Sequence, residues 1–270
     1  MTTYTKKQTQ LGQLLSHKDL LIAWTTRIVK ARYQQSVLGG LWAVLQPLAM
    51  ALILTFIFDR ILAIDTGDGT PYLVFNYAAL VPWTLFEASV TSSVGSLVAN
   101  MGLVSKIYFP REILPMAEVA ARLVDFSIAY LLLIGFMLFY REPGEAVFTL
   151  SWLYIPVVLA VQICLILGIG FIGSALNVFY RDISHVIVLF LRLWFYATPI
   201  IYPVTRVPER FRAYYFMNPM AGIIESYRNV ILRGEGLHEY FVFSAIFSIS
   251  ILVFGYWLFK KLEFQFADIV

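Results

Sequence analysis

Long apolar stretches separated by short polar segments dominate the pattern of the sequence. A helix needs about 20 mostly apolar residues to cross the hydrocarbon core of a bilayer. Stretches that approach or exceed this length lie at residues 33–58, 70–105, 114–140, 146–180, 183–203 and 240–259. The pattern therefore predicts an all-α, polytopic membrane protein with six transmembrane helices. One domain would cover residues 1–270 and hold the six-span bundle at 37–262.

The N-terminal segment, residues 1–36, predicts a different kind of helix. At 100° per residue one apolar stripe forms, made of Leu20, Leu21, Trp24, Ile28 and Ala31. The flanking side chains of Arg27 and Arg32 are long enough to reach lipid headgroups. This pattern predicts an interfacial amphipathic helix on the inner leaflet. It is either a simple anchor or a mechanical element that turns into the first span at Gly39 and Gly40.

Between the second and third predicted spans the sequence reads NMGLVSKIYFPREILP, at residues 100–115. The consecutive apolar residues Ile107, Tyr108 and Phe109 are more than a solvated connector needs. Exposed apolar clusters of this kind often mark protein contacts. The segment therefore predicts a short docking helix for a cytoplasmic partner.

The fifth span is followed by an irregular outer segment, residues 204–236. Pro199 and Pro203 interrupt the helix within or near the membrane. Asn218 is suited to an N-cap, Pro219 to the first helical position and Gly234 to the C-terminal stop. These signals predict a broken, partly re-entrant hairpin, with an ordinary surface helix on the bundle as the alternative.

Five charged residues fall inside the predicted spans: Glu87, Glu118, Arg122, Asp125 and Arg192. Charges at such positions are costly unless they pair or face water, so each is a candidate for function. Glu118 and Arg122 are four residues apart and could neutralise each other. Arg192 is expected to pair with Asp125, although an arginine at this depth could also attract the phosphate of an amphiphilic substrate.

Basic residues set the predicted orientation. With both termini cytoplasmic, the inner segments hold Lys6, Lys7, Lys18, Arg27, Lys30, Arg32, Lys106, Arg111, Arg181, Lys260 and Lys261. The two short outer loops hold only Arg60 and Arg141. Because cytoplasmic loops are enriched in lysine and arginine, the sequence predicts that the N and C termini both lie in the cytoplasm.

Composition narrows the functional classes. The chain is 60% hydrophobic and 14% charged, with a mean hydropathy of +0.75, and a net charge of +3 gives no reason to expect nucleic acid as a partner. One cysteine and three scattered histidines have no metal-ligand spacing. No phosphate-binding loop G-x-x-x-x-G-K-[ST] and no catalytic motif is found, so uphill transport would need a partner or an ion gradient. No cleavable signal peptide is expected, since the first twenty residues are polar and basic.

Several motifs, in order along the chain, resemble the ABC-2 type permeases that export bacterial O-antigen, capsule and teichoic acid polymers. They are RYQQSVLGGLWAVLQPL, KIYFPREILP, NVFYRDISHVIVLFLRLWFYATPIIYP and NPMAGIIESYRNVIL. The resemblance implies a homodimer in the bacterial inner membrane with two ATPase subunits, which would carry ATP and Mg²⁺. Its cargo would be a lipid-linked polysaccharide such as O-antigen.

The resemblance also implies roles for individual residues. The interfacial helix, with Trp24, Arg27, Ile28 and Arg32, would contact the ATPase together with the first inner loop. In that loop the coupling residues would be Lys106, Ile107, Tyr108, Phe109, Pro110 and Arg111. The outer hairpin would carry gate helices, with Asn218, Pro219, Glu225, Tyr227 and Arg228. The first and fifth spans would line a channel between two copies, which makes Trp42, Trp194 and Tyr196 candidate ring contacts for sugars.

Other classes remain open at this point. An ABC-2 exporter of teichoic acid, drugs or lipids would share the six spans and the ATPase. A membrane-embedded glycosyltransferase or polymerase acting on the same carrier lipid would instead need carboxylates at the membrane surface. The acids of the short outer loops, such as Asp59 and Asp65, have the spacing of ordinary solvated residues.

Overall fold

The computed structural model describes residues 17–34, 36–67, 69–106, 109–140 and 148–266, and the regular elements found there are all helices. The α-helices are α2 (Lys18–Tyr33), α3 (Trp42–Thr55), α4 (Tyr72–Ala99), α5 (Met101–Val104), α6 (Ile113–Tyr140), α7 (Ile155–Phe179), α8 (Ile183–Tyr196), α9 (Glu209–Tyr215), α10 (Pro219–Arg228) and α11 (Phe241–Leu262). Short π-helical turns extend two of them, Phe56–Ile61 after α3 and Asn229–Arg233 after α10. The all-α prediction is confirmed.

Five of the described helical segments are long and apolar enough to cross a membrane. They are Gly39–Ile61, Tyr72–Ala99, Ile113–Tyr140, Leu150–Phe179 and Phe241–Gln265. Each coincides with a predicted span, and the largest boundary differences are at the start of the first span, the end of the second and the end of the last.

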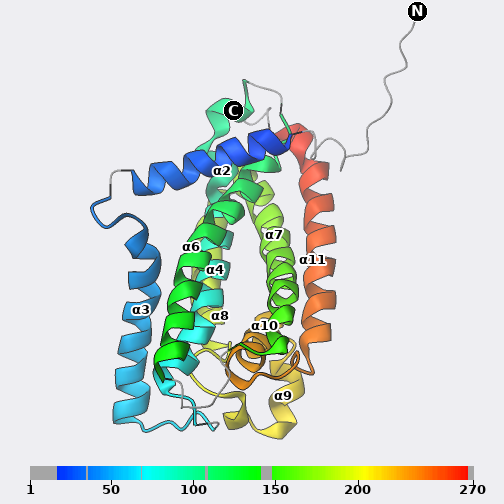
Figure 1. The fold of residues 1–270 in the computed structure, drawn as a ribbon. Coiled ribbons are helices and arrows are strands. Elements are labelled where there is room, and N and C mark those ends of the chain that lie inside the picture. Colours follow the sequence, from blue (N-terminus) through cyan, green and yellow to red (C-terminus); the bar gives the residue numbers. More distant parts are fainter. Residues whose placement is uncertain (1–16, 35, 68, 107–108, 141–147, 267–270) are drawn as a thin grey trace, which may run out of the picture.

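The predicted fifth span is shorter than expected. Helix α8 has 14 residues, about 21 Å at 1.5 Å per residue, which is less than the hydrocarbon core of about 30 Å. It ends at Tyr196, three residues before Pro199. The irregular segment that follows completes the passage, since α9 lies at the opposite end of the bundle from α2 and the C-terminal end of α11 (Figure 1). The chain thus passes along the bundle six times, but only five passes are made by long continuous helices.

Helix α4 is the centre of the bundle. In the most apolar 18-residue stretch of α4, 78% of the residues are buried, whereas 17% are buried in the most apolar stretches of the α3 and α6 segments. It packs against α3, α6, α7, α8 and α10. A helix that is apolar all round, as α4 is, is stable in such a central position because no face needs water.

Two glycines allow α7 and α11 to approach closely. A Cβ atom added at Gly255 would lie 2.4 Å from the carbonyl oxygen of Gly168, and one at Gly168 would lie 2.4 Å from the Ile251 side chain. Small residues at helix contacts are typical of membrane bundles, where backbone packing replaces the hydrophobic effect.

Helix α2 lies across one end of the bundle, nearly perpendicular to the other helices (Figure 1). We call this end, which also holds the C-terminal end of α11, the α2 end. No residue of α2 is fully buried. Of the apolar stripe, Leu20, Leu21, Trp24 and Ile28 are partly buried against the bundle and Ala31 is exposed, and the contact of the helix with the inner leaflet stays a prediction.

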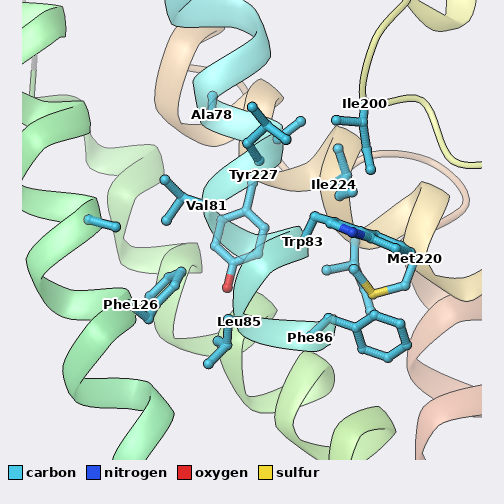
Figure 2. Packing of buried hydrophobic residues seen from close by; sticks show 14 of the residues in the cluster. Ala78, Val81, Trp83, Leu85, Phe86, Phe126, Ile200, Met220, Ile224 and Tyr227 are labelled. Atoms are coloured by element: carbon cyan, nitrogen blue, oxygen red, sulfur yellow. The ribbon is translucent and has the colours of Figure 1, made fainter. Parts of the chain in front are cut away.

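Apolar side chains form two clusters along the bundle. The larger one joins α4, α6, α7, α8 and α10, and includes Trp83, Phe86, Met220 and Tyr227 (Figure 2). The second lies at the α2 end, with Leu114, Phe171, Phe259 and Phe266 at its centre and Trp24 and Phe109 packed against it. We call the second one the α2-end cluster.

Candidate functional site

The segment predicted to be the outer hairpin contains a helix in the interior of the protein. Asn218 caps α10, since its Oδ1 accepts a hydrogen bond from the Met220 backbone N–H at 3.0 Å, and Pro219 occupies the first turn. Every residue of α10 is buried. The π-helical turn after α10 ends at Gly234, whose φ of 67° is left-handed. The predicted caps are therefore confirmed, and α10 is a buried helix and not one on the surface of the bundle, whereas its re-entrance into the membrane stays a prediction.

Arg228, a predicted gate residue, is the most heavily bonded side chain of this helix. Its guanidinium is fully buried, pairs with Glu225 at 2.7 Å and lies 3.6 Å above the Phe75 ring. It also donates to the carbonyl oxygens of Pro199, Ile200 (2.8 Å) and Phe75 (3.3 Å). A buried charge is stable only when paired and hydrogen-bonded, and here Arg228 satisfies carbonyls of the interrupted segment after α8.

Tyr227, another predicted gate residue, takes part in a buried chain of hydrogen bonds. Its hydroxyl donates to Gln162 Oε1 at 3.0 Å, and Gln162 Nε2 donates to the Pro82 carbonyl oxygen at 2.6 Å. Figure 2 shows the Tyr227 ring among side chains that include Leu85 and Phe126. The sequence analysis missed Gln162, although a lone glutamine inside an uncharged apolar stretch is a usable signal for a buried polar contact.

The three candidate channel residues differ in exposure. Trp42, at the start of α3, is 49% exposed and Tyr196, at the end of α8, is 67% exposed. Trp194 is partly buried, and its indole N–H donates to Asn218 Oδ1 at 2.7 Å. Asn218 Nδ2 in turn donates to Thr198 Oγ1 at 2.9 Å. Trp194 thus joins α8 to the cap of α10, and a sugar contact for any of the three stays a prediction.

The charges of α6 gather where α2 crosses it. Asp125 accepts hydrogen bonds from Arg32 at 2.6 Å and from the Tyr33 hydroxyl, and pairs with Arg122 at 3.4 Å. Burial, together with the bond to Asp125, raises the pKa of Tyr33, which therefore stays protonated and donates. Two expectations were wrong: Arg32 faces the bundle instead of headgroups, and Asp125 pairs with Arg32 and Arg122, not with Arg192.

The other predicted intramembrane charges have separate surroundings. In the part of the chain that is described, the ion pair of Arg122 is with Asp125 and not with Glu118. Arg192 is exposed on α8. Glu87 accepts a hydrogen bond from the Trp83 indole, one turn earlier on α4, at 3.1 Å. Because Arg32 reaches Asp125 from α2, Asp125 lies near the depth of α2 and not near the middle of the bundle.

A small cleft adjoins the Asp125 cluster between α3, α4 and α6. Its volume is about 50 Å³. Its polar wall is formed by Gln46, Thr84, Arg122 and Asp125, and the remainder is apolar or alanine. The cleft therefore has room for a few water molecules at a place where charged groups meet a loosely covered helix.

The predicted coupling loop contacts the C-terminal end of α11 and the residues that follow it. Lys106 is exposed, whereas Phe109, Pro110 and Arg111 are partly buried. Arg111 donates to the Glu263 carbonyl oxygen and lies above the Phe266 ring. Ile107 and Tyr108 lie outside the described residues.

An ion-pair network next to this loop was missed by the sequence analysis. Lys260 on α11 bridges the buried carboxylate of Glu112 at 2.7 Å and that of Glu263 at 2.9 Å. Lys260 and Glu263 are three positions apart on the same turn, but Glu112 is 148 positions from Lys260, so the sequence pattern held no signal for that pairing. The loop and the end of α11 consequently form one unit.

Comparison with known proteins agrees with this architecture. The ABC-2 type transporter family matches residues 19–232. An O-antigen export system permease protein RfbA of Klebsiella pneumoniae is 34% identical over 98% of this chain and 99% of its own length. The RfbA protein of Myxococcus xanthus is 30% identical over 81% of this chain and 82% of its own. The polysialic acid transport protein KpsM of Escherichia coli is 27% identical over 88% and 91%. The chain therefore belongs to the ABC-2 type transporter family.

Proposed function

We propose that this chain is the transmembrane subunit of an ATP-driven exporter that moves a lipid-linked, O-antigen-like polysaccharide from the cytoplasmic side across the bacterial inner membrane. The observation that carries this proposal is the similarity to O-antigen export permeases over almost the whole chain. The buried α10 supports it, since irregular backbone at membrane depth is tolerated where it is buried in protein or lines a wet cavity.

The energy comes from partner subunits. The chain has no phosphate-binding loop, so ATP and Mg²⁺ bind to two separate ATPase subunits. These subunits dock at the α2 end, which is the cytoplasmic end and holds α2 and the C-terminal end of α11. The contact surface consists of α2 and the loop around Lys106, the exposed coupling residue among those described. Arg111 and Phe109 hold this surface against the bundle, Arg111 through Glu263 and Phe109 through the α2-end cluster.

The functional unit is a homodimer with the translocation path between its two copies. Helices α3 and α8 leave large apolar side chains exposed, among them Trp42, Phe190 and Tyr196. Exposed rings at these positions stack on sugar faces as the glycan passes, while the outer hairpin controls its exit. Arg228 holds α10 in place during this passage and does not itself line the path.

Gene deletion tests the proposed function in the cell. We expect deletion to leave full-length lipid-linked glycan on the cytoplasmic face, because polymer synthesis continues while export stops. Shortened glycan in the deletion strain would contradict the proposal and favour a polymerase. Unchanged surface glycan with a changed lipid or drug content would favour an ABC-2 exporter of another cargo.

A second cargo follows from a specific observation. The similarity to KpsM extends over 88% of the chain at 27% identity, so an acidic capsular polymer is the alternative substrate. Chemical analysis of the retained glycan separates the two, because a polysialic-acid-like polymer carries a carboxylate on every residue. The higher identity to RfbA proteins favours the O-antigen-like cargo.

A further inference from the structure

Asp125 joins two helices that have different orientations. Its carboxylate accepts from Arg32 and Tyr33 of α2 and pairs with Arg122 of its own helix, α6. The Asp125 side chain is 17% exposed, that of Arg32 23% and that of Arg122 28%. Charge-assisted hydrogen bonds in such partly desolvated surroundings are stronger and more directional than surface pairs. The contact is therefore a defined attachment of α2, not an incidental one.

A second attachment of α2 is apolar and lies nearer its other end. Trp24 packs against the α2-end cluster, which holds the loop before α6 and the end of α11. Helix α2 also packs along α6 through partly buried residues, and none of its residues is fully buried. A force on the exposed face of α2 would consequently act on Asp125 through Arg32 and Tyr33.

The chain after α2 leads directly back to the neighbourhood of Asp125. Gly39 has a φ of 50°, a left-handed value that favours glycine, and a Cβ at Gly40 would lie 3.6 Å from Ile128 of α6. Helix α3 therefore begins against α6 within one turn of Asp125. The cleft between α3, α4 and α6 is lined by Gln46 and Asp125, so its width depends on where α3 sits.

We propose that Asp125 is a positioning residue for transport: it is the joint through which a displacement of α2 is passed to α6 and to the cleft beneath α3. The origin of the displacement rests on the proposed function, in which ATPase subunits act on the α2 end. A few short polar contacts can fix α2 and α6 in one of two relative positions. A change between two such positions transmits a movement. The carboxylate charge is the essential feature, since it binds the two α2 donors while Arg122 balances it.

The test uses the complete exporter with its ATPase subunits in liposomes, and measures glycan translocated per ATP hydrolysed. We expect Asp125→Asn to lower this ratio about fivefold or more, because the amide keeps the shape but loses the charge-assisted bonds. Asp125→Glu should retain most of the ratio, and Tyr33→Phe should lower it less than Asp125→Asn. A merely structural clip would change the amount of folded protein but not this ratio.

Ser127→Ala is the matched control. Ser127 is exposed on α6, and its hydroxyl donates to Leu123 of the same helix, so the control ratio should equal that of the wild type. If Asp125→Asn does not fold, Tyr33→Phe and Arg32→Gln must still lower the ratio. If the ratio is unchanged in these variants while the wild type exports, the proposal for Asp125 is refuted and the proposed function still stands. A wild-type complex that binds ATPase yet exports no glycan would overturn the proposed function itself.

Discussion

Arg228 shows why charged residues in an apolar sequence need not face a water-filled path. Its guanidinium has five N–H donors in a rigid fork, and partners in Glu225, Phe75, Pro199 and Ile200 use this geometry. The same side chain therefore neutralises a buried acid and satisfies carbonyls at the interrupted end of α8. If Arg228 affects function, it does so by fixing the position of α10.

Removal of this guanidinium should destabilise the protein strongly. We expect Arg228→Met to lower the free energy of unfolding by about 3 kcal/mol, because it leaves Glu225 buried with a weaker partner and removes a donor from three carbonyls. Thermal unfolding in detergent measures the change. Arg210→Met on α9 is the control, since Arg210 is exposed and should lose almost nothing. Equal losses in the two variants would show that Arg228 is not a stabilising centre.

His238 should make the end of the bundle opposite α2 sensitive to acid. Its ring stacks on Phe216 at 4.6 Å, and its Nδ1 accepts from the Tyr240 backbone N–H at 3.3 Å, which requires the neutral form. Burial lowers the pKa of His238 despite the nearby acids Glu225 and Glu239, while Arg233 lowers it further. A lowered folded-state pKa means that stability is full above the unfolded pKa and declines as the pH falls below it.

We therefore expect the unfolding temperature to fall between about pH 7 and pH 5, and His238→Gln to make the fall shallower. Scanning calorimetry of the purified protein across this range provides the measurement. Identical pH profiles for the wild type and His238→Gln would refute the assignment. His185 is exposed on α8, so His185→Gln is the matched control and should leave the profile unchanged.

At the scale of elements, the sequence predicted most of the bundle because a bilayer restricts the choice. The apolar lengths located five spans within a few residues, and the caps Asn218 and Gly234 located the ends of the α10 segment. The prolines at 199 and 203 correctly predicted a break after the fifth span, but the sequence did not show that α8 ends before it is long enough to cross the bilayer. Helix propensity and hydropathy are properties of a short segment, whereas the depth of such a break in the bilayer depends on how the whole bundle packs.

The candidate site was less predictable than the fold. Residue types indicated that Asp125 and Arg122 matter, but the other partners of Asp125, Arg32 and Tyr33, came from α2, about ninety positions away. The pairing of Glu112 with Lys260 had no local signal either. Long-range pairing depends on how the helices pack, and one sequence without an alignment contains no direct record of it.

The close approach of α7 and α11 gives a prediction for this scale. We expect Gly255→Val to lower the free energy of unfolding by about 2 kcal/mol, because a side chain there collides with the Gly168 carbonyl and pushes the helices apart. Gly135→Val on α6 is the control, since a Cβ at Gly135 meets nothing within 4 Å. Detergent stability of both variants gives the answer. A Gly255→Val protein as stable as Gly135→Val would contradict the described packing.

At the scale of the whole molecule, the exposed surface of the α2 end should determine ATPase binding. We expect Lys106→Glu to reduce the amount of ATPase that co-purifies about threefold, because a single exposed charge contributes modestly to association. Quantitative mass spectrometry of the purified complex measures it. Arg210→Glu, at the opposite end, should leave the ratio unchanged. If Arg210→Glu had the larger effect, the ATPase would dock at the other end and the orientation would be reversed.

The central claim is that this chain forms the membrane passage of an ATP-driven polysaccharide exporter. The most direct measurement purifies the tagged chain in mild detergent with its partners, reconstitutes the complex in liposomes and follows the movement of lipid-linked glycan across the bilayer. We predict a stoichiometric ATPase with a phosphate-binding loop, and glycan movement that requires ATP hydrolysis. A chain that co-purifies with no ATPase even after crosslinking in the membrane, or a complex whose ATP hydrolysis moves no glycan, would contradict this account.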